Sequence, residues 1–526
     1  MKIALAQLNY TIGDIDGNTS KIIDSINKAK AQRADLVIFA EQAVSGTPAF
    51  DLLRKTTFLE LCEDALVEIA SCCDGIAAIV GLPILTREGT ISAAALIQDR
   101  KVLRYVGKKY ITARREMGFL VPSKGFEYAT IKGHKCAIVV GDDLSREHDF
   151  DKSVETVISI NARKYGRGTM TYRYEMMRHL SFVEAKNIVL VNQVGGATDI
   201  VYDGTSGAFN NRGELVLMMK QFEEDFQIFD TKAQNPPVGV PSTYNDRTRM
   251  VYQAARCGLR DFFLKNGYKK ACIGLSGGID SAVVACLAAD ALGAGNVRAL
   301  LLPSQFSSDH SVEDAKKLAE NLGIEYNVIP ITEIYTSVVN TLKPVIGGTE
   351  FDATEENIQT RIRTVLLMAV QNKTDYILLN SSNKSENALG LCTLYGDTAG
   401  AFSPTGDLYK SEMYDVARYI NRTFGNVIPE NILDKEPSSE LHPGQKDSDI
   451  LPPYEVVDAI LLRMIEEGQH REEIVNAGFD SEVVEKIHCM IMRNEKKRYQ
   501  FPPVLRLSMC SFGHERLMPL TNKYGD

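Results

Sequence analysis

The sequence predicts an α/β protein with two domains. Its 526 residues are enough for two hydrophobic cores of ordinary size. Strand-like apolar runs alternate with helical patterns in both halves, which is typical of layered α/β domains. The proline-rich stretch from Asn235 to Pro241 separates the halves. We therefore predict a first domain at 1–235, a linker at 236–250 and a second domain at 251–526.

The composition favours a soluble globular protein and excludes several classes. Hydrophobic residues make up 44% of the chain and charged residues 24%, so extensive disorder is not expected. A net charge of −9 argues against a nucleic-acid-binding surface. Ten cysteines are scattered without metal-type spacing, and we found no signal sequence or membrane-length apolar run. These features predict a cytoplasmic protein with reduced thiols and no membrane partner.

The first domain opens with a strand pattern at Lys2 to Gln7, a helical pattern at Asn18 to Arg33 and an apolar strand at Leu36 to Ala40. Glu41 stands at the end of that strand. Further strand patterns occupy residues 76–81, 93–98, 136–140 and 188–192.

The second domain is organised around the loop Ser276 to Ser281, which joins the apolar run 271–275 to the helical run 282–292. A strand, a Gly-Gly turn and a helix together aim backbone N–H groups at one point, which suits an anion such as pyrophosphate. Asp280 could hold the magnesium that such an anion needs. No Gly-Lys-Ser/Thr follows, so this is not a Walker-type loop. An ordinary glycine-rich turn is the alternative for an isolated Gly-Gly.

The pattern after this loop favours a ligand site. Strand patterns at Val297 to Leu302 and Tyr326 to Ile329 flank a helix, which we expect to open with a capping box at Ser311 to Asp314. This βαβαβ order predicts a Rossmann-like, doubly wound parallel sheet with the loop at a strand's carboxyl end.

Polar segments follow another predicted strand, Tyr376 to Leu379. They are Asn380 to Glu386, Thr393 to Asp397 and Gly406 to Lys410, and we expect them to face the same crevice. An amphipathic helix from Thr354 to about Lys373 carries Asn357, Arg361 and Arg363, some of which can share a face. Arginines in such a position are by default solvated surface residues.

The loop Ser276-Gly277-Gly278-Ile279-Asp280-Ser281 resembles the SGGxDS loop of the ATP pyrophosphatases, which include NAD, GMP and asparagine synthetases. The run Asn383 to Glu386, with Leu394 to Asp397 and Lys410, is similar to NAD synthetases and not to the other two. The resemblance implies an adenine nucleotide alpha hydrolase-like fold, ATP as co-substrate and Mg²⁺.

The NAD synthetase resemblance also implies residue roles. Asp280 and Glu386 would hold magnesium, and Lys410 would contact phosphate. The implied ATP contacts are Gly274, Leu275, Ser276, Gly277, Gly278, Ile279, Asp280, Ser281 and Ser381. The implied contacts to deamido-NAD are Asn357, Arg361, Glu386, Asp397 and Lys497. The polar loop Gln445 to Asp449, with Leu451 to Tyr454, is long enough to cover the site.

The first domain is similar to the nitrilase-related glutaminase domain of glutamine-dependent NAD synthetases. The similar segments are 36–41, 191–196 and 202–206. The resemblance implies a four-layer αββα sandwich in which Glu41 is the general base and Lys108 stabilises the oxyanion. The family's nucleophilic cysteine is absent, because Gly141 stands at its position in Val140 to Leu144.

Other residues of the first domain do not compensate for Gly141. Cys136 lies five residues away along a strand, about 16 Å, and on the opposite face. Arg163-Lys164 and Thr47 also depart from the family pattern. We therefore predict that this domain does not hydrolyse glutamine. Glu41 and Lys108 would then form a buried ion pair that holds the fold, and the domain would serve packing or assembly of a homo-oligomer, a dimer through the synthetase domain and possibly an octamer.

The predicted activity is ATP-dependent amidation of deamido-NAD to NAD through an acyl-adenylate, with ammonia as nitrogen source. Three alternatives remain: an intact glutamine-dependent NAD synthetase, another adenylating amidotransferase, and a non-catalytic dinucleotide sensor. The first requires a nucleophile that the sequence does not place. The completeness of Asp280, Glu386 and Lys410 argues against the last.

Overall fold

The structure is a computed structural model that describes residues 1–146, 149–233, 235–244, 246–347 and 350–523. The chain forms two compact units, 1–246 and 247–526. The domain limits at 235 and 251 remain a prediction. No helix among the described residues is long and apolar enough to cross a membrane.

The first unit contains two six-stranded sheets and a short hairpin. In spatial order the first sheet is β14 (Asp225–Asp230), β1 (Lys2–Gln7), β2 (Leu36–Ile38), β3 (Ala77–Leu85), β4 (Thr90–Gln98) and β5 (Lys101–Gly107). The second is β13 (Leu215–Met218), β12 (Gly207–Phe209), β9 (Asn187–Asn192), β8 (Thr156–Asn161), β7 (His134–Val140) and β6 (Glu127–Ile131). The hairpin pairs β10 (Val194–Ala197) with β11 (Ile200–Asp203).

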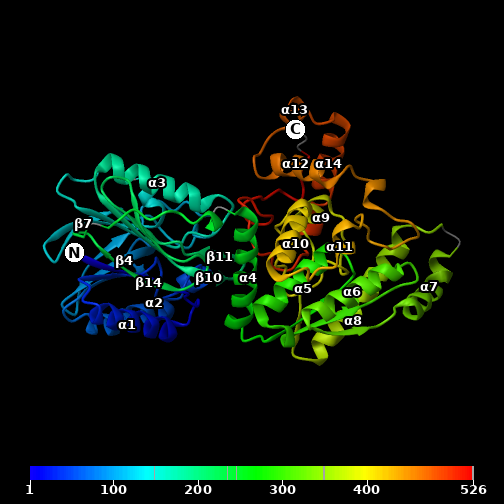
Figure 1. Ribbon diagram of the computed structural model, residues 1–526, viewed down its shortest axis with the longest axis horizontal. Helices are drawn as coiled ribbons and strands as arrows, with labels where there is room; N and C mark the ends of the chain where they lie inside the picture. The colour runs from blue at the N-terminus through cyan, green and yellow to red at the C-terminus, as the bar shows by residue number, and fades with distance from the viewer. Residues whose placement is uncertain (147–148, 234, 245, 348–349, 524–526) are drawn as a thin grey trace. The chain divides into compact units, whose positions relative to one another are not determined.

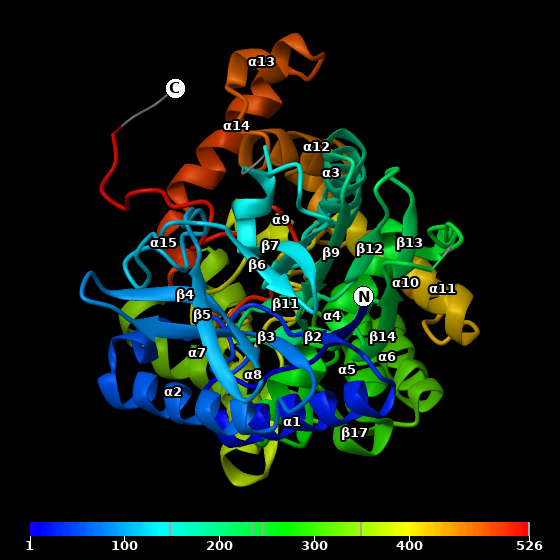
Figure 2. The same ribbon diagram turned by 90° about the vertical axis from the view of Figure 1, so that its left-hand side faces the viewer.

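The alternation of side chains along β7 shows how the layers form. Ile138 and Val140 are buried in the core between the two sheets, whereas Ala137 and Val139 belong to the core beneath α3 (Thr169–Glu184). Helices α1 (Ile15–Ala31) and α2 (Thr56–Ser71) cover the outer face of the first sheet, as Figures 1 and 2 show. The predicted four-layer αββα sandwich is therefore confirmed.

The second unit contains a four-stranded sheet in which all strands are parallel. Its spatial order is β17 (Glu325–Val328), β16 (Val297–Leu301), β15 (Lys270–Gly274) and β18 (Tyr376–Leu378). Cys272 and Leu300 pack against α7 (Thr332–Ile346) and α8 (Ala353–Lys373), while α5 (Ile279–Leu292) and α6 (Asp309–Leu322) connect the first three strands. The predicted doubly wound sheet is confirmed.

The strand order of this sheet determines where a ligand can bind. The chain adds β16 and then β17 on one side of β15, and later adds β18 on the other side. The strand order therefore reverses between β15 and β18, and parallel sheets bind ligands at the carboxyl ends of the strands at such a point. The predicted pyrophosphate loop and the segment beginning at Asn380 both lie at this point.

The other helices of this unit follow or precede the sheet. They are α4 (Arg247–Lys265), α9 (Lys384–Leu389), α10 (Lys410–Phe424), α11 (Glu430–Asp434), α12 (Tyr454–Ile465), α13 (Arg471–Asn476), α14 (Ser481–Arg493) and α15 (Glu495–Arg498).

The starts of helices α6 and α1 differ from the predictions. The capping box expected at Ser311 is wrong, because α6 begins at Asp309 and Ser308 is its N-cap, accepting a hydrogen bond from the Ser311 amide. Helix α1 begins at Ile15 instead of Asn18, since Asp14 caps it by accepting from the amide of Gly17.

Candidate active site

A cavity of about 310 Å³ lies at the carboxyl ends of β15, β16 and β18. Every predicted ATP-binding position lines it, namely Gly274, Leu275, Ser276, Gly277, Gly278, Ile279, Asp280, Ser281 and Ser381. Glu386, Asp397 and Lys410 line it as well. The topology thus gathers these predicted residues, which extend from Gly274 to Lys410 in the sequence, around one cavity.

The predicted pyrophosphate loop, Ser276 to Ser281, is held by its own hydroxyl groups. The amides of Ser276 and Gly278 donate to the hydroxyls of Ser281 and Ser276, each at 3.2 Å, and the Ser281 hydroxyl donates to the carbonyl of Gly278 at 3.1 Å. Helix α5 begins at Ile279, so the positive end of its dipole faces the cavity. This arrangement is suited to an anion.

Gly277 cannot be replaced without moving backbone. Its φ is +81°, and a Cβ built on it would lie 2.2 Å from the carbonyl oxygen of Ser311. We expect Gly277→Ala to destabilise the second unit by roughly 1–3 kcal/mol and to weaken ATP binding. Thermal unfolding and nucleotide titration would measure both effects. Gly295→Ala is the matched control, because nothing lies within 4 Å of its built Cβ; equal behaviour of the two variants would contradict this role for Gly277.

Two carboxylates and one ammonium group form the charged centre of the cavity. Lys410 Nζ lies 2.5 Å from Asp280 Oδ2 and 3.2 Å from Glu386 Oε1. Asn383 contacts both acidic residues: its side-chain amide donates to Asp280 Oδ1 at 3.0 Å, and its side-chain oxygen accepts from the backbone amide of Glu386 at 2.9 Å. Asn383 is also the N-cap of α9, so one residue caps the helix that carries Glu386 and binds the Asp280 carboxylate.

Burial and neighbouring charges shift the pKa values of this centre. Burial raises the pKa of Glu386 to about 8, and the negative charge of Asp280 adds to this, while Lys410 opposes it. Burial lowers the pKa of Lys410, but attraction to Asp280 and Glu386 outweighs this and raises it above its ordinary value. Lys410 therefore remains a cation throughout the physiological range of pH.

The raised pKa of Glu386 predicts a pH dependence of stability. Its ordinary value is 4.5, so between about 4.5 and about 8 the folded state binds more protons than the unfolded state. The contribution of Glu386 to the free energy of unfolding therefore falls as pH rises through this window. We expect the thermal midpoint of the wild type to fall relative to that of Glu386→Gln between pH 5.5 and 8.5. The thermal midpoint of Glu472→Gln, at an exposed position, should change with pH as that of the wild type does. A difference in thermal midpoint between Glu386→Gln and the wild type that does not change with pH would contradict the raised pKa of Glu386.

The residues around Lys410 fit a magnesium ion. Asp280 Oδ2 and Glu386 Oε1 converge on one point, as their shared ammonium partner shows. Carboxylate oxygens beside a phosphate site are the ligands that Mg²⁺ prefers. Both predicted metal positions, Asp280 and Glu386, are thus brought together.

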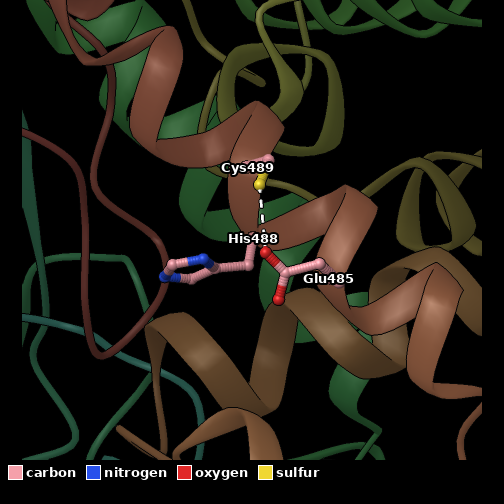
Figure 3. Close-up of side chains that lie close together, drawn as sticks. All are labelled: Glu485, His488 and Cys489. Atoms are coloured by element: carbon pink, nitrogen blue, oxygen red, sulfur yellow. Dashed lines mark hydrogen bonds between the residues drawn. The ribbon is translucent and has the colours of Figure 1, made fainter. Parts of the chain in front are cut away.

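A second group of metal-type side chains lies on one turn of α14. Glu485, His488 and Cys489 have ligand atoms within 4.8 Å of one another. Figure 3 shows the three side chains on the helix. Arg471 pairs with the Glu485 carboxylate, and the Cys489 thiol donates to the same carboxylate at 3.2 Å. The hydrogen bond to Glu485 raises the pKa of Cys489, which keeps the thiol protonated. This cluster is therefore already satisfied by its own neighbours.

Segment 435–441 lines the cavity, although we did not predict this from the sequence. Glu440 accepts hydrogen bonds from the hydroxyls of Ser308 and Ser311 at 2.8 and 2.7 Å and pairs with Lys435 at 2.6 Å. These contacts fasten the segment to the N-terminus of α6. Of the covering loop that we predicted, Asp447 lines the cavity and accepts a hydrogen bond from the Tyr454 hydroxyl at 2.8 Å.

Helix α8 presents a different face to the cavity from the one predicted. Its lining residues are Thr360, Arg363, Thr364 and Leu367, which follow helical spacing. Arg363 Nε donates to the carbonyl of Leu302 at 2.9 Å, and burial lowers its pKa to about 10. These four positions form one stripe of the helix, but the stripe alone does not show that it faces a cavity.

Three predicted substrate contacts lie outside this cavity. Arg361 Nε donates to the Leu394 carbonyl at 3.2 Å, and Asn357 Oδ1 accepts from the Thr393 hydroxyl at 2.6 Å. Lys497 Nζ donates to the carbonyls of Gly390 and Cys392 at 2.7 and 2.8 Å. All three residues hold segment 390–394, and their contact with deamido-NAD remains a prediction. Asp397 accepts from the Thr393 amide at 2.7 Å, and burial raises its pKa to about 6.

The first unit places Glu41, Lys108 and Gly141 together. Lys108 Nζ lies 3.2 Å from Glu41 Oε1 and 2.9 Å from Glu116 Oε2, with all three side chains at most 7% exposed. The Ser92 hydroxyl donates to Glu41 at 2.8 Å. A Cβ built on Gly141 would lie 2.7 Å from Lys108 Cε and 2.9 Å from Glu41 Oε2. Residue 141 therefore faces the predicted base and oxyanion lysine directly, and it has no side chain to react.

Cys136 is not a substitute for the missing nucleophile. It packs in the core between the two sheets, and burial raises the pKa of its thiol to about 12. Arg163 Nε lies 2.8 Å from Asp142 Oδ1, next to Gly141. Burial by itself would raise the pKa of Asp142. The positive charges of Arg163 and Lys108 outweigh burial and lower this pKa to about 2. The surroundings of Gly141 are thus occupied by ion pairs.

An anion-suited loop at a topological switch point, with two carboxylates and a lysine beside it, is typical of a nucleotide-using enzyme domain. A family model described as NAD synthase matches residues 251–501. The glutamine-dependent NAD(+) synthetase of Acinetobacter baylyi is 37% identical to this chain, covering 99% of it and 98% of the relative. That of Thermotoga maritima is 35% identical, covering 100% and 99%.

Solved structures give the same result. A glutamine-dependent NAD+ synthetase from Acinetobacter baumannii in complex with ADP matches with a TM-score of 0.76 and 34% identity, covering 99% of this chain and 98% of that one. One from Cytophaga hutchinsonii has a TM-score of 0.87 at 20% identity, covering the same shares, and supports the fold. The chain belongs to the glutamine-dependent NAD(+) synthetase family. It is a ligase of NAD biosynthesis with a nitrilase-like first unit.

Proposed function

We propose that this chain converts deamido-NAD (nicotinic acid adenine dinucleotide) to NAD, using ATP and ammonia and releasing AMP and pyrophosphate. The observation that carries the proposal is the convergence of the loop 276–281, Asp280, Glu386 and Lys410 on one cavity. Family membership narrows the reaction to an NAD synthetase.

The parts of the cavity match the demands of the reaction. A carboxylate is a poor electrophile, so ATP must first convert it to an acyl-adenylate with loss of pyrophosphate. The loop amides and the N-terminus of α5 would bind the departing pyrophosphate, and the Lys410 ammonium would stabilise its developing charge. Mg²⁺ held by Asp280 and Glu386 would supply further neutralisation of that charge. Segment 435–441 would keep water from the adenylate, so that ammonia displaces AMP.

The nitrogen source is the part of the proposal on which two observations disagree. The relatives are named as glutamine-dependent, which favours the alternative of a functional glutamine-dependent enzyme over free ammonia. The geometry around Gly141 favours ammonia, because the residue facing Glu41 and Lys108 has no nucleophilic atom. We give more weight to the local chemistry, since a family name does not supply a missing thiolate.

An assay with two nitrogen donors tests this proposal. The purified full chain is supplied with ATP, Mg²⁺ and deamido-NAD, and with either ammonium chloride or glutamine freed of ammonia. We expect NAD from ammonium and none above background from glutamine, since loss of a nucleophile costs roughly 10⁶-fold in turnover. The Acinetobacter baylyi enzyme, assayed with the same glutamine, is the positive control.

The outcomes separate the alternatives. Efficient NAD formation from glutamine would show that glutamine is the nitrogen source in place of free ammonia. The proposed synthetase reaction itself would not be affected. Turnover of xanthosine monophosphate or aspartate, with deamido-NAD ignored, would indicate another adenylating amidotransferase. Binding of deamido-NAD without pyrophosphate release would indicate a sensor. The homo-oligomer and the cytoplasmic location remain proposals, and the oligomer can be checked by mass measurement in solution.

A further inference from the structure

Lys410 occupies the point on which the two predicted metal ligands converge. We propose that its ammonium group takes the place of the divalent cation in the free enzyme and keeps metal out of the Asp280–Glu386 pair. Binding of a nucleoside triphosphate then draws the ammonium group away. Metal and nucleotide then bind as a coupled pair. This inference rests on the proposed function, because it concerns the ATP site of the same reaction.

The contacts of the two carboxylates carry the first step. Asp280 turns Oδ1 toward the Asn383 amide and Oδ2 toward Lys410, so the oxygen left for a metal is the one that the ammonium holds. Glu386 presents Oε1 to the same ammonium, and its backbone amide is fixed by Asn383. A cation arriving between these oxygens must therefore displace Lys410.

Charge and burial determine how strongly Lys410 competes. The side chains of Lys410, Asp280 and Glu386 are 6%, 16% and 23% exposed, so water screens their attraction only weakly. The ammonium is tethered to the chain, which gives it a high effective concentration at the pair. A free divalent ion in dilute solution must therefore compete with an ammonium group that is both strongly attracted to the two carboxylates and held close to them.

The anchoring of Lys410 shows how it can be released. Its backbone amide donates to the Ser385 hydroxyl at 2.9 Å, and that hydroxyl donates to Asp458 at 2.5 Å. Lys410 lines the same cavity as the loop 276–281. The side chain can therefore turn toward an anion in the loop while its backbone stays fixed. A triphosphate both attracts the ammonium and supplies additional oxygens to the metal.

Thermodynamic linkage makes the proposal measurable without turnover. If nucleotide removes the competitor of the metal, it raises metal affinity, and metal raises nucleotide affinity by the same factor. Binding of Mn²⁺ to the full chain is measured at pH 8 from the electron paramagnetic resonance signal of the free ion, with and without α,β-methylene-ATP, which cannot be cleaved between its α and β phosphates. In the wild type we expect Mn²⁺ to bind at least ~10-fold more tightly with the nucleotide.

Variants of Lys410 provide the decisive comparison. In Lys410→Met the carboxylate pair is unoccupied by the ammonium, and we expect Mn²⁺ to bind without nucleotide at least ~10-fold more tightly than in the wild type. Lys410→Arg keeps a cation and should remain close to the wild type. Adding Asp280→Asn to Lys410→Met should abolish the gain, which locates it at this pair.

Three results would overturn the proposal. They are wild-type binding of Mn²⁺ without nucleotide as tight as with it, no gain in Lys410→Met, and an equal gain in Lys410→Arg. The wild-type comparison requires no variant to fold. Failure of the proposed function is recognised separately, as absence of NAD formation in the donor assay, and would leave these binding results unaffected.

Discussion

Lys410→Met is expected to lower the ammonia-dependent rate of NAD formation by about 10²–10³-fold, the cost typical of removing one group that stabilises developing charge. Lys410 is the ammonium group that contacts both Asp280 and Glu386 in the cavity. Its loss removes positive charge where pyrophosphate departs, so the effect should fall on kcat. KM for deamido-NAD should change little, because most of the predicted contacts of the dinucleotide lie at other residues.

The measurement is steady-state NAD formation at saturating ammonium, with ATP and deamido-NAD varied in turn. Lys410→Arg keeps the charge and should retain more activity than Lys410→Met. Asp415→Asn is a control on the exposed face of the same helix, where the carboxylate pairs with Arg418 and is 59% exposed. A loss of less than tenfold in Lys410→Met, or an effect confined to KM for deamido-NAD, would remove Lys410 from the chemical step.

The parts of the site that the sequence predicted are those set by local pattern and topology. Gly277 and Gly278 lie between two apolar runs, so the strand, turn and helix could be recognised without a partner. Glu386 and Lys410 follow a later strand, and parallel sheets bring the carboxyl ends of neighbouring strands together. The structure places both residues within 3.2 Å of each other, as this topology requires.

Other parts depend on distances that no local pattern encodes. Arg361 and Arg363 lie on the same helix, and only the packing of α8 against β15 and β18 decides that Arg363 faces the cavity. Glu440 meets Ser308 and Ser311 across more than 120 residues, from a segment without regular secondary structure. Neither feature follows from hydrophobic periodicity. Periodicity shows which face of an element is buried, but it does not show which residues that face packs against.

The sequence also underestimated the cluster in the first unit. It predicted Glu41 and Lys108 as a pair, whereas the structure adds Glu116, whose carboxylate lies 2.9 Å from the lysine. Glu116 belongs to an irregular segment after β5, where sequence patterns give no direction for a side chain. The consequence is that two buried carboxylates share the Lys108 ammonium, with the Arg115 guanidinium close by.

Because of this arrangement, loss of the Lys108 side chain should be costly for the stability of the first unit. Lys108→Met leaves Glu41 and Glu116 buried without their shared cation, and breaking such a group from one side typically costs about 3–5 kcal/mol. Burial raises the pKa of Glu41 and Lys108 opposes this, so removing the lysine should drive Glu41 toward its neutral form. We expect the thermal midpoint to fall strongly at pH 8 and less at pH 5.5, where protonation relieves the repulsion.

A second change distinguishes loss of charge balance from loss of packing. Lys108→Met combined with Glu116→Gln removes one negative charge together with the positive one, and should recover part of the stability lost in the single variant. Lys2→Met, at an exposed position, is the control. If the single and double variants unfold at the same temperature, the cluster does not act as a charge-balanced unit. Recovery of stability in the double variant would indicate that Lys108 and Glu116 act as a charge-balanced unit. Residues at the predicted glutaminase site would then stabilise the core of the first unit.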